Sequence, residues 1–231
     1  MGQVRTASLM VAVQCAMLGT TACSAEGRGG NASPEQAKAV AVLFSSGFKS
    51  IEEDKARIDK MRLAYRPYSG IRRTAEQRLA DNLQNFSLPL AMEDPGEFLR
   101  SGAAGETADR KLAALGLPPD TVAGATVLMF GLAWELANQR PLSATDQQAL
   151  LSQVDNQLKA NELRERGDAA KQREAEIRLL TAGVWLEEAR LRQGSPTQMQ
   201  ALSDAVQRDM LRMSGSDMRA HQIGADGFEK R

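Results

Sequence analysis

The sequence is poor in the residues from which most catalytic and metal sites are built. It has a single histidine, His221, and two cysteines, Cys15 and Cys23, both close to the N-terminus. One histidine excludes zinc sites built on two histidines, and it excludes Ser-His-Asp and Cys-His catalytic groups unless His221 itself supplies the base. Met218 precedes His221 by three positions, so the Glu-x-x-His pairs of di-iron bundles are missing as well. We therefore expect no metal and no cofactor, and we expect His221 to lie on the surface of the C-terminal tail.

Aromatic residues and net charge are also scarce. Aromatics make up only 4% of the chain, which disfavours carbohydrate-binding proteins and β-sandwiches. The 29 basic and 29 acidic side chains cancel, so no overall field attracts nucleic acid or anionic lipid. No stretch alternates apolar and polar residues for long enough to predict a strand, whereas Ala, Leu, Gln, Glu and Arg favour helices. The composition therefore predicts an all-α protein.

Residues 1–25 have the layout of a secretory signal peptide. A basic start at Arg5 is followed by an apolar stretch over residues 7–19 and by small residues over 20–25. The apolar stretch is shorter than the roughly 20 residues of a membrane-spanning helix. We predict export to the periplasm or out of the cell, with cleavage before Glu26 or before Cys23.

Cleavage before Cys23 would expose the thiol to which bacterial lipoproteins attach their lipid. Thr21 and Ala22 fit the lipoprotein pattern, but Thr20 stands where that pattern usually has Leu. Two alternatives stay open, plain cleavage and a lipid anchor on Cys23, and only the second would bring the processed chain to a membrane. Because both cysteines lie at or before the cleavage region, no internal disulfide is expected in the processed chain.

After the signal peptide, residues 26–32 predict a flexible tether and residues 33–231 predict one helical domain. No fixed period of 20–50 residues recurs, so we expect an irregular bundle of about seven helices. The helix predicted over 121–138 is apolar on every side and should be buried on every face, at the centre of the bundle. Asp120 is its predicted cap. Asp120 and Glu135 bracket only 14 uncharged residues, which is too few to span a membrane.

Capping residues, prolines and glycines predict the limits of the other elements. We expect helices from Ser33 to Pro67 with a break near Gly47, over 72–86, over 106–115, from Ser143, over 168–193 with Asp168 as cap, and from Ser195 to near Gly215. We expect the Pro- and Gly-rich residues 87–105 to cross the surface as a loop. The tail, residues 216–231, should lie back on the surface.

The segment from Arg62 to Arg73 concentrates residue types that often carry function. Tyr65, Tyr68, Arg72 and Arg73 alternate around a proline turn, a pattern typical of contacts with nucleic acid or lipid headgroups. Acidic residues flank the segment and an exported protein rarely meets nucleic acid, so no nucleic-acid partner is expected. Two alternatives stay open: a turn whose tyrosines pack and whose arginines pair, or a surface that binds a partner.

Two classes of function remain after these exclusions. The first is a non-enzymatic interaction protein with an unknown protein partner in the cell envelope. The second is a cell-wall-active hydrolase that uses a lone carboxylate of raised pKa, with Glu97 and Glu135 as candidates. We expect Glu135 to reach solvent at the end of its helix. A deep cleft with a buried glutamate would favour the hydrolase, and a filled bundle with an exposed apolar patch would favour the interaction protein.

Residues 65–228 resemble a family of exported proteobacterial proteins of unknown function. The resemblance is carried by the residues of the Tyr-x-Pro segment, the central helix and the C-terminus, namely Tyr65, Pro67, Arg72, Arg73, Gly116, Leu117, Asp120, Val122, Ala123, Ala133, Trp134, Val184–Ala189, Gly227 and Phe228. It implies a helical fold and export, and it transfers no activity and no site.

Overall fold

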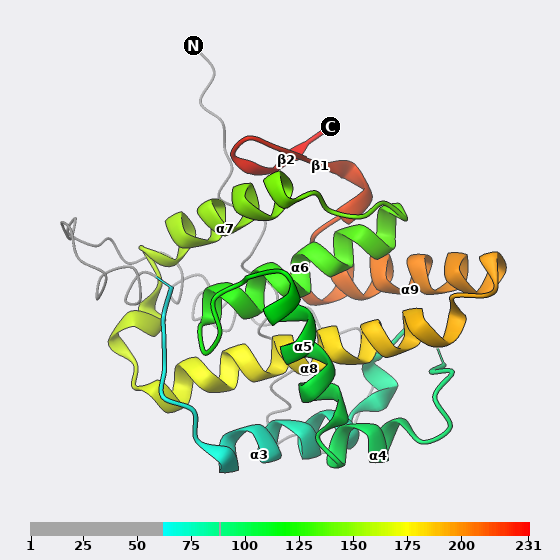
Figure 1. Cartoon of the computed structure of the whole chain (residues 1–231), viewed down its shortest axis with the longest axis horizontal. Helices are drawn as coiled ribbons and strands as arrows, with labels where there is room; N and C mark the ends of the chain where they lie inside the picture. The colour runs from blue at the N-terminus through cyan, green and yellow to red at the C-terminus, as the bar shows by residue number, and fades with distance from the viewer. Residues whose placement is uncertain (1–61, 88) are drawn as a thin grey trace, which may run out of the picture.

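The structure is a computed structural model that describes residues 62–87 and 89–231 (Figure 1). The predictions for the signal peptide, for Cys23, for the tether and for the helix from Ser33 lie outside the described residues. The described residues form seven α-helices and one sheet of two strands. The predicted all-α class, with an irregular bundle of about seven helices, is confirmed.

The elements follow one another through short connections. The helices are α3 (Ser69–Ala80), α4 (Pro95–Arg100), α5 (Ala103–Ala114), α6 (Val122–Asn138), α7 (Ala144–Leu158), α8 (Asp168–Arg192) and α9 (Pro196–Ser214). Short 3₁₀ helices span Leu83–Asn85, Glu162–Glu165 and Met218–Ala220. An antiparallel hairpin of β1 (His221–Gly224) and β2 (Gly227–Lys230) ends the chain.

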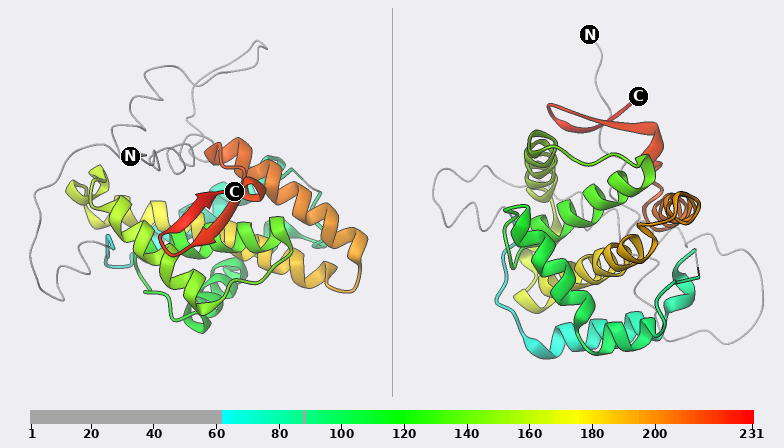
Figure 2. Two further views of the ribbon diagram at one scale, coloured as in Figure 1. Left: turned by 90° about the horizontal axis from the view of Figure 1, so that it is seen from above. Right: turned by 45° about the vertical axis from the view of Figure 1, so that its right-hand side comes forward.

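Helix α6 forms the centre of the bundle, as its apolar composition predicts. All of its residues except Glu135 and Asn138 are buried, and it packs against α7, α8 and α9. Trp134 is 1% exposed, and its indole Nε1 donates a hydrogen bond to the carbonyl oxygen of His221 at 2.9 Å. Figures 1 and 2 show the hairpin, α7, α6, α8 and α3 following one another across the molecule in that order.

Close packing of α5 on α8 depends on a glycine in the middle of α8. A Cβ atom built on Gly183 would lie 2.1 Å from the carbonyl oxygen of Ala104, a distance that no real contact reaches. Only glycine therefore allows the two helices to approach this closely. The contact fixes α5 beside α8, where both helices contribute to the site described below.

The local capping signals of α7 and α9 are confirmed. Ser143 caps α7 in a capping box with Asp146, in which each side chain accepts a hydrogen bond from the other residue's backbone N–H. Ser195 caps α9, which begins at Pro196, and Gly215 ends it in the left-handed conformation. These signals depend on neighbours in the sequence, which is why the sequence alone predicts them.

The predicted caps Asp120 and Asp168 are wrong. Thr121 caps α6, since its Oγ1 accepts a hydrogen bond from the backbone N–H of Gly124 at 2.9 Å. Gly167 is the cap position of α8, and the carboxylate of Asp168 instead accepts the backbone N–H of Arg66 at 3.1 Å. Asp120 takes a positive φ of 50°, and its carbonyl oxygen accepts the backbone N–H of Tyr65 at 3.0 Å. Both aspartates hold a distant segment, so their neighbours in the sequence give no sign of their role.

The predicted loop over residues 87–105 contains a helix and buried side chains. Asp94 caps α4 by accepting the backbone N–H of Glu97 at 2.7 Å, and Pro95 occupies the first turn. Leu99 and Met92 are buried against α3 and α8, so the segment belongs to the core. The predicted helix over 72–86 is also displaced, because α3 begins at Ser69 and ends at Ala80. The prolines and glycines of this segment predict a loop, although Asp94 and Pro95 together form a local helix start.

The C-terminal tail forms the hairpin and is not an irregular surface segment. Gln153 of α7 binds both backbone groups of Phe228, with distances of 3.0 Å to the nitrogen and 3.2 Å to the oxygen. His221, predicted on the surface, is only 5% exposed, and its Nδ1 lies 2.5 Å from the carbonyl oxygen of Asp217. Each strand has four residues, too few to show an alternating pattern in the sequence.

Candidate functional site

Residues 62–68 cross the starts of α6 and α8, with a turn at Arg62 and Leu63 and no regular helix in the rest. The carbonyl oxygens of Arg62 and Leu63 accept the backbone N–H groups of Ala123 and Val122, at 3.1 and 3.4 Å. The first turn of a helix has N–H groups without a partner inside the helix, and here the crossing segment supplies the partners. The segment is therefore fixed to the central helix before α3 begins.

The side chain of Gln172 in α8 binds both backbone polar groups of Tyr68. Its Oε1 accepts the Tyr68 N–H at 2.7 Å, and its Nε2 donates to the Tyr68 carbonyl oxygen at 3.1 Å. The same Nε2 donates to Oε1 of Glu176 at 3.1 Å. The Gln172 side chain is buried, and its hydrogen bonds fix the position of the Tyr68 backbone.

Arg72 joins three helices through two carboxylates. Its Nε donates to Glu176 of α8 at 2.8 Å, and its two terminal nitrogens donate to the carboxylate of Asp109 of α5 at 2.6 and 3.2 Å. Burial alone would lower the pKa of Arg72, but the hydrogen bond with Asp109 and the charge of Glu176 raise it above its ordinary value. We call Arg72, Asp109, Gln172 and Glu176 the buried junction, because Gln172 and Glu176 are buried; Arg72 and Asp109 connect them to the surface and are partly exposed.

The four predicted site residues divide into two groups. Tyr65 is buried in the main core, where burial and the nearby charge of Glu176 raise the pKa of its hydroxyl, so it stays protonated. Arg72 belongs to the buried junction. Tyr68 is 51% exposed, and Arg73 is exposed and makes no ion pair with the residues that the structure describes. Tyr65 and Arg72 therefore pack and pair inside the protein, as the first alternative predicts. Of the four residues, only Tyr68 and Arg73 are exposed for contact with a partner.

A groove of about 590 Å³ opens beside Tyr68. The buried junction forms one part of its lining, and Leu112, Leu117, Pro119 and Asp120 form much of the rest. Three carboxylates and one guanidinium line it, from Asp109, Asp120, Glu176 and Arg72. The groove thus combines apolar surface with an excess of negative charge. We call Tyr68 together with this groove the Tyr68 surface.

The two glutamates predicted for a hydrolase lie outside the groove. Glu97 is exposed on α4. Glu135 is half-buried, and its Oε1 accepts the backbone N–H of Leu142 at 2.7 Å, so it closes a turn where the sequence predicted a solvated side chain. The cavity that Glu135 lines measures about 10 Å³, which is room for roughly one water molecule and not for a sugar ring.

Sequence reasoning missed the buried charged residues, among them Glu76, Glu188 and Arg192. Glu188 accepts hydrogen bonds from the backbone N–H groups of Ala91 and Met92 and from Arg192, and so anchors the chain before α4. Glu76, one turn after Arg72, is buried, its carboxylate makes no hydrogen bond to another described residue, and burial raises its pKa. In the sequence all three resemble charges on solvated helix faces, so no local signal distinguishes them.

The described residues contain no group of three or more His, Cys, Asp or Glu side chains placed to hold a metal ion. No helix among them is both long and apolar enough to cross a membrane. Comparison with family models, curated proteins and solved structures found no match to this chain. The resemblance to an exported proteobacterial family stays a prediction, and the site has to be interpreted from its own geometry.

Proposed function

We propose that this protein is an exported, non-enzymatic interaction protein that binds a protein partner of the cell envelope through the Tyr68 surface. The observation that carries the proposal is an aromatic ring that is 51% exposed on a backbone held from both sides by the buried Gln172. Tyrosine is among the residues that most often carry interface energy, since it offers a large, rigid and amphipathic area. A fixed backbone lowers the entropy that is lost when the partner binds.

The surroundings of Tyr68 distinguish it from the other exposed apolar side chains. Among the described residues, Leu191 near the end of α8 and Leu211 in α9 are the other large apolar side chains that are exposed. Neither lines the groove, whereas Tyr68 does. A partner side chain that enters the groove would contact the tyrosine ring and the apolar lining together. The excess of carboxylates favours a basic partner side chain.

The alternative of a cell-wall-active hydrolase has no comparable support. Its candidate acids Glu97 and Glu135 lie outside the 590 Å³ groove. The carboxylate in the groove that is most buried, Glu176, already accepts hydrogen bonds from Arg72 and Gln172. A general acid needs a free proton directed at the substrate, and this carboxylate is engaged with the protein itself.

Site-specific photo-crosslinking in cells tests the proposal. A photoreactive phenylalanine analogue at position 68 should give a discrete crosslinked product with an envelope protein, identified by mass spectrometry. The same analogue at positions 191 and 211 provides matched exposed controls. The proposal fails if position 68 crosslinks no more than the two controls while all three variants accumulate as folded protein.

A further inference from the structure

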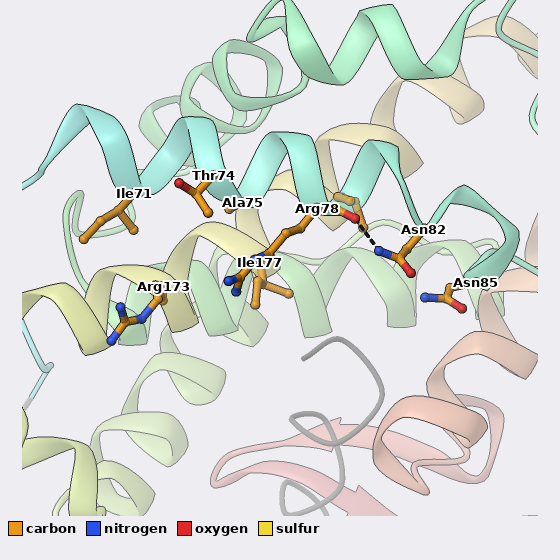
Figure 3. A pocket seen from close by; sticks show the side chains of 9 residues that line it. Ile71, Thr74, Ala75, Arg78, Asn82, Asn85, Arg173 and Ile177 are labelled. Atoms are coloured by element: carbon orange, nitrogen blue, oxygen red, sulfur yellow. Dashed lines mark hydrogen bonds between the residues drawn. The ribbon is translucent and has the colours of Figure 1, made fainter. Parts of the chain in front are cut away.

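A second recess lies on the other side of the contact between α3 and α8 (Figure 3). Gln172 and Glu176 of α8 line the groove of the Tyr68 surface, whereas Arg173 and Ile177, one position further along, line the second recess. A shift of one position rotates the side chain by about 100° around a helix, which explains why one pair of helices serves two separate sites. Nothing in the proposed function uses this recess.

Two arginines without acidic partners border this recess. Figure 3 shows Arg78 reaching from α3 towards Ile177 and Arg173 of α8. Neither guanidinium makes a hydrogen bond or ion pair with the described residues, and no carboxylate lines the recess. The acids nearest to them in the two helices do not line the recess: Glu76 of α3 is buried, and Glu174 of α8 accepts a hydrogen bond from Arg178. Both arginines line the recess and both are exposed, so an anion bound there would be attracted by two positive charges.

The floor of the recess is apolar and small. Ile71, Ala75, Leu79 and Ile177 supply aliphatic surface, and the cavity volume is about 120 Å³. A dry cavity of roughly 150 Å³ in another protein holds one benzene ring, so this recess of about 120 Å³ has room for an apolar group of about four or five carbons. Arginine offers a flat pair of N–H donors that matches a carboxylate, and charge-assisted hydrogen bonds of this kind are strong.

We infer that this recess, between Arg78, Arg173 and Ile177, binds a small monocarboxylate with a short aliphatic tail. The carboxylate lies between the two guanidinium groups, and the tail covers Ile71 and Ile177. Charge complementarity selects the head, and the volume of the cavity limits the tail.

Titration of the processed chain with hexanoate, followed by NMR of isotope-labelled isoleucine methyl groups, tests the inference. Hexanoate should shift the methyl signals of Ile71 and Ile177 saturably and leave that of Ile223, in the hairpin, unchanged. 1-Hexanol, which keeps the tail but has no charge, should bind about tenfold more weakly, the factor expected for loss of a charge-assisted hydrogen bond. Acetate, which keeps the charge but has no tail, should bind more weakly as well.

The variant carrying Arg78→Gln and Arg173→Gln should lose the preference for hexanoate over hexanol. The variant Arg73→Gln removes an exposed arginine of the same helix that does not line the recess, so it should keep the preference. Equal binding of hexanoate and hexanol to the unaltered chain, or no saturable shift, overturns the inference. So does a short acidic peptide that shifts both methyl signals when hexanoate does not, because the occupant is then a protein. Crosslinking at position 68 is independent of all these results.

Discussion

Tyr68 and Arg72 lie one helical turn apart, yet the structure gives them opposite surroundings. Arg72 is held between Asp109 and Glu176 in the buried junction, while the side chain of Tyr68 projects beside the groove. Both belong to residue types that are common in interfaces, so residue type alone does not separate a structural role from a binding role. The number of partners inside the protein separates them: a side chain whose hydrogen bonds are all satisfied internally has little to offer a partner.

The largest effect on stability is expected from Arg72→Ala. The change leaves Glu176, which is 2% exposed, without its charged partner. Removing one member of a buried ion pair costs about 3–5 kcal/mol, and here about 2–4 kcal/mol is expected because Arg72 is itself a third exposed. Chemical denaturation measures the loss. Arg73→Ala is the control and should change the free energy of unfolding by less than about 0.5 kcal/mol. Equal effects of the two variants would contradict the claim that Arg72 stabilises the fold and Arg73 does not.

Gln172 belongs to the buried junction and also holds the backbone of Tyr68, so Gln172→Ala should change both stability and crosslinking from position 68. It removes both hydrogen bonds to the Tyr68 backbone, at a cost of about 1–3 kcal/mol, and it should also weaken crosslinking from position 68. Gln153→Ala is a matched control, because Gln153 binds both backbone groups of Phe228 in the same way. Gln153→Ala should lower stability by a similar amount and leave crosslinking unchanged. Loss of crosslinking in both variants would show that general destabilisation, and not the position of Tyr68, is responsible.

Glu76 adds a dependence on pH to the region of the buried junction. Burial raises its pKa in the folded protein, so folding favours its protonated form. The folded state then binds more protons than the unfolded state, and stability falls as the pH rises above about 4.3 towards the folded pKa. Glu76→Gln removes this charge, so it should raise the melting temperature at pH 7 and raise it less at pH 4. Glu97→Gln, a change of an exposed glutamate on α4, should shift the melting temperature equally little at both values. A loss of stability at pH 7 on replacing Glu76 would show that its charge supports Arg72.

The sequence predicted those parts of the fold that depend on nearby residues. Helix α6 is apolar over its whole length, and the caps at Ser143 and Ser195 bond to residues three positions away. Some errors concern residues whose partners are distant: Asp168 binds the backbone of Arg66, 102 positions earlier. Others are local, since the caps at Thr121 and Asp94 also bond to residues three positions away. The hairpin was missed because its strands have four residues each and are held by Gln153 of α7.

The residue types of the Arg62–Arg73 segment predicted where the candidate site lies. The sequence could not show which of these residues stabilise the fold and which are exposed for binding. Arg72 meets Asp109 and Glu176, which stand 37 and 104 positions further along the chain. Nothing near Arg72 in the sequence shows that these partners exist, and nothing near Tyr68 shows that its ring has none. Only the packing of α3, α5 and α8 separates the residues that stabilise the fold from the residue that is free to bind.

The Tyr68→Ala variant tests the central claim most directly, through two measurements on the same protein. The free energy of unfolding should fall by no more than about 0.5–1 kcal/mol, because the side chain is half exposed. Capture of the envelope protein crosslinked from position 68 should be lost, while Leu211→Ala, which truncates another exposed apolar side chain, should capture it normally. Unchanged capture by Tyr68→Ala, or a fall in stability as large as that of Arg72→Ala, would contradict the claim that Tyr68 serves binding and Arg72 serves the fold.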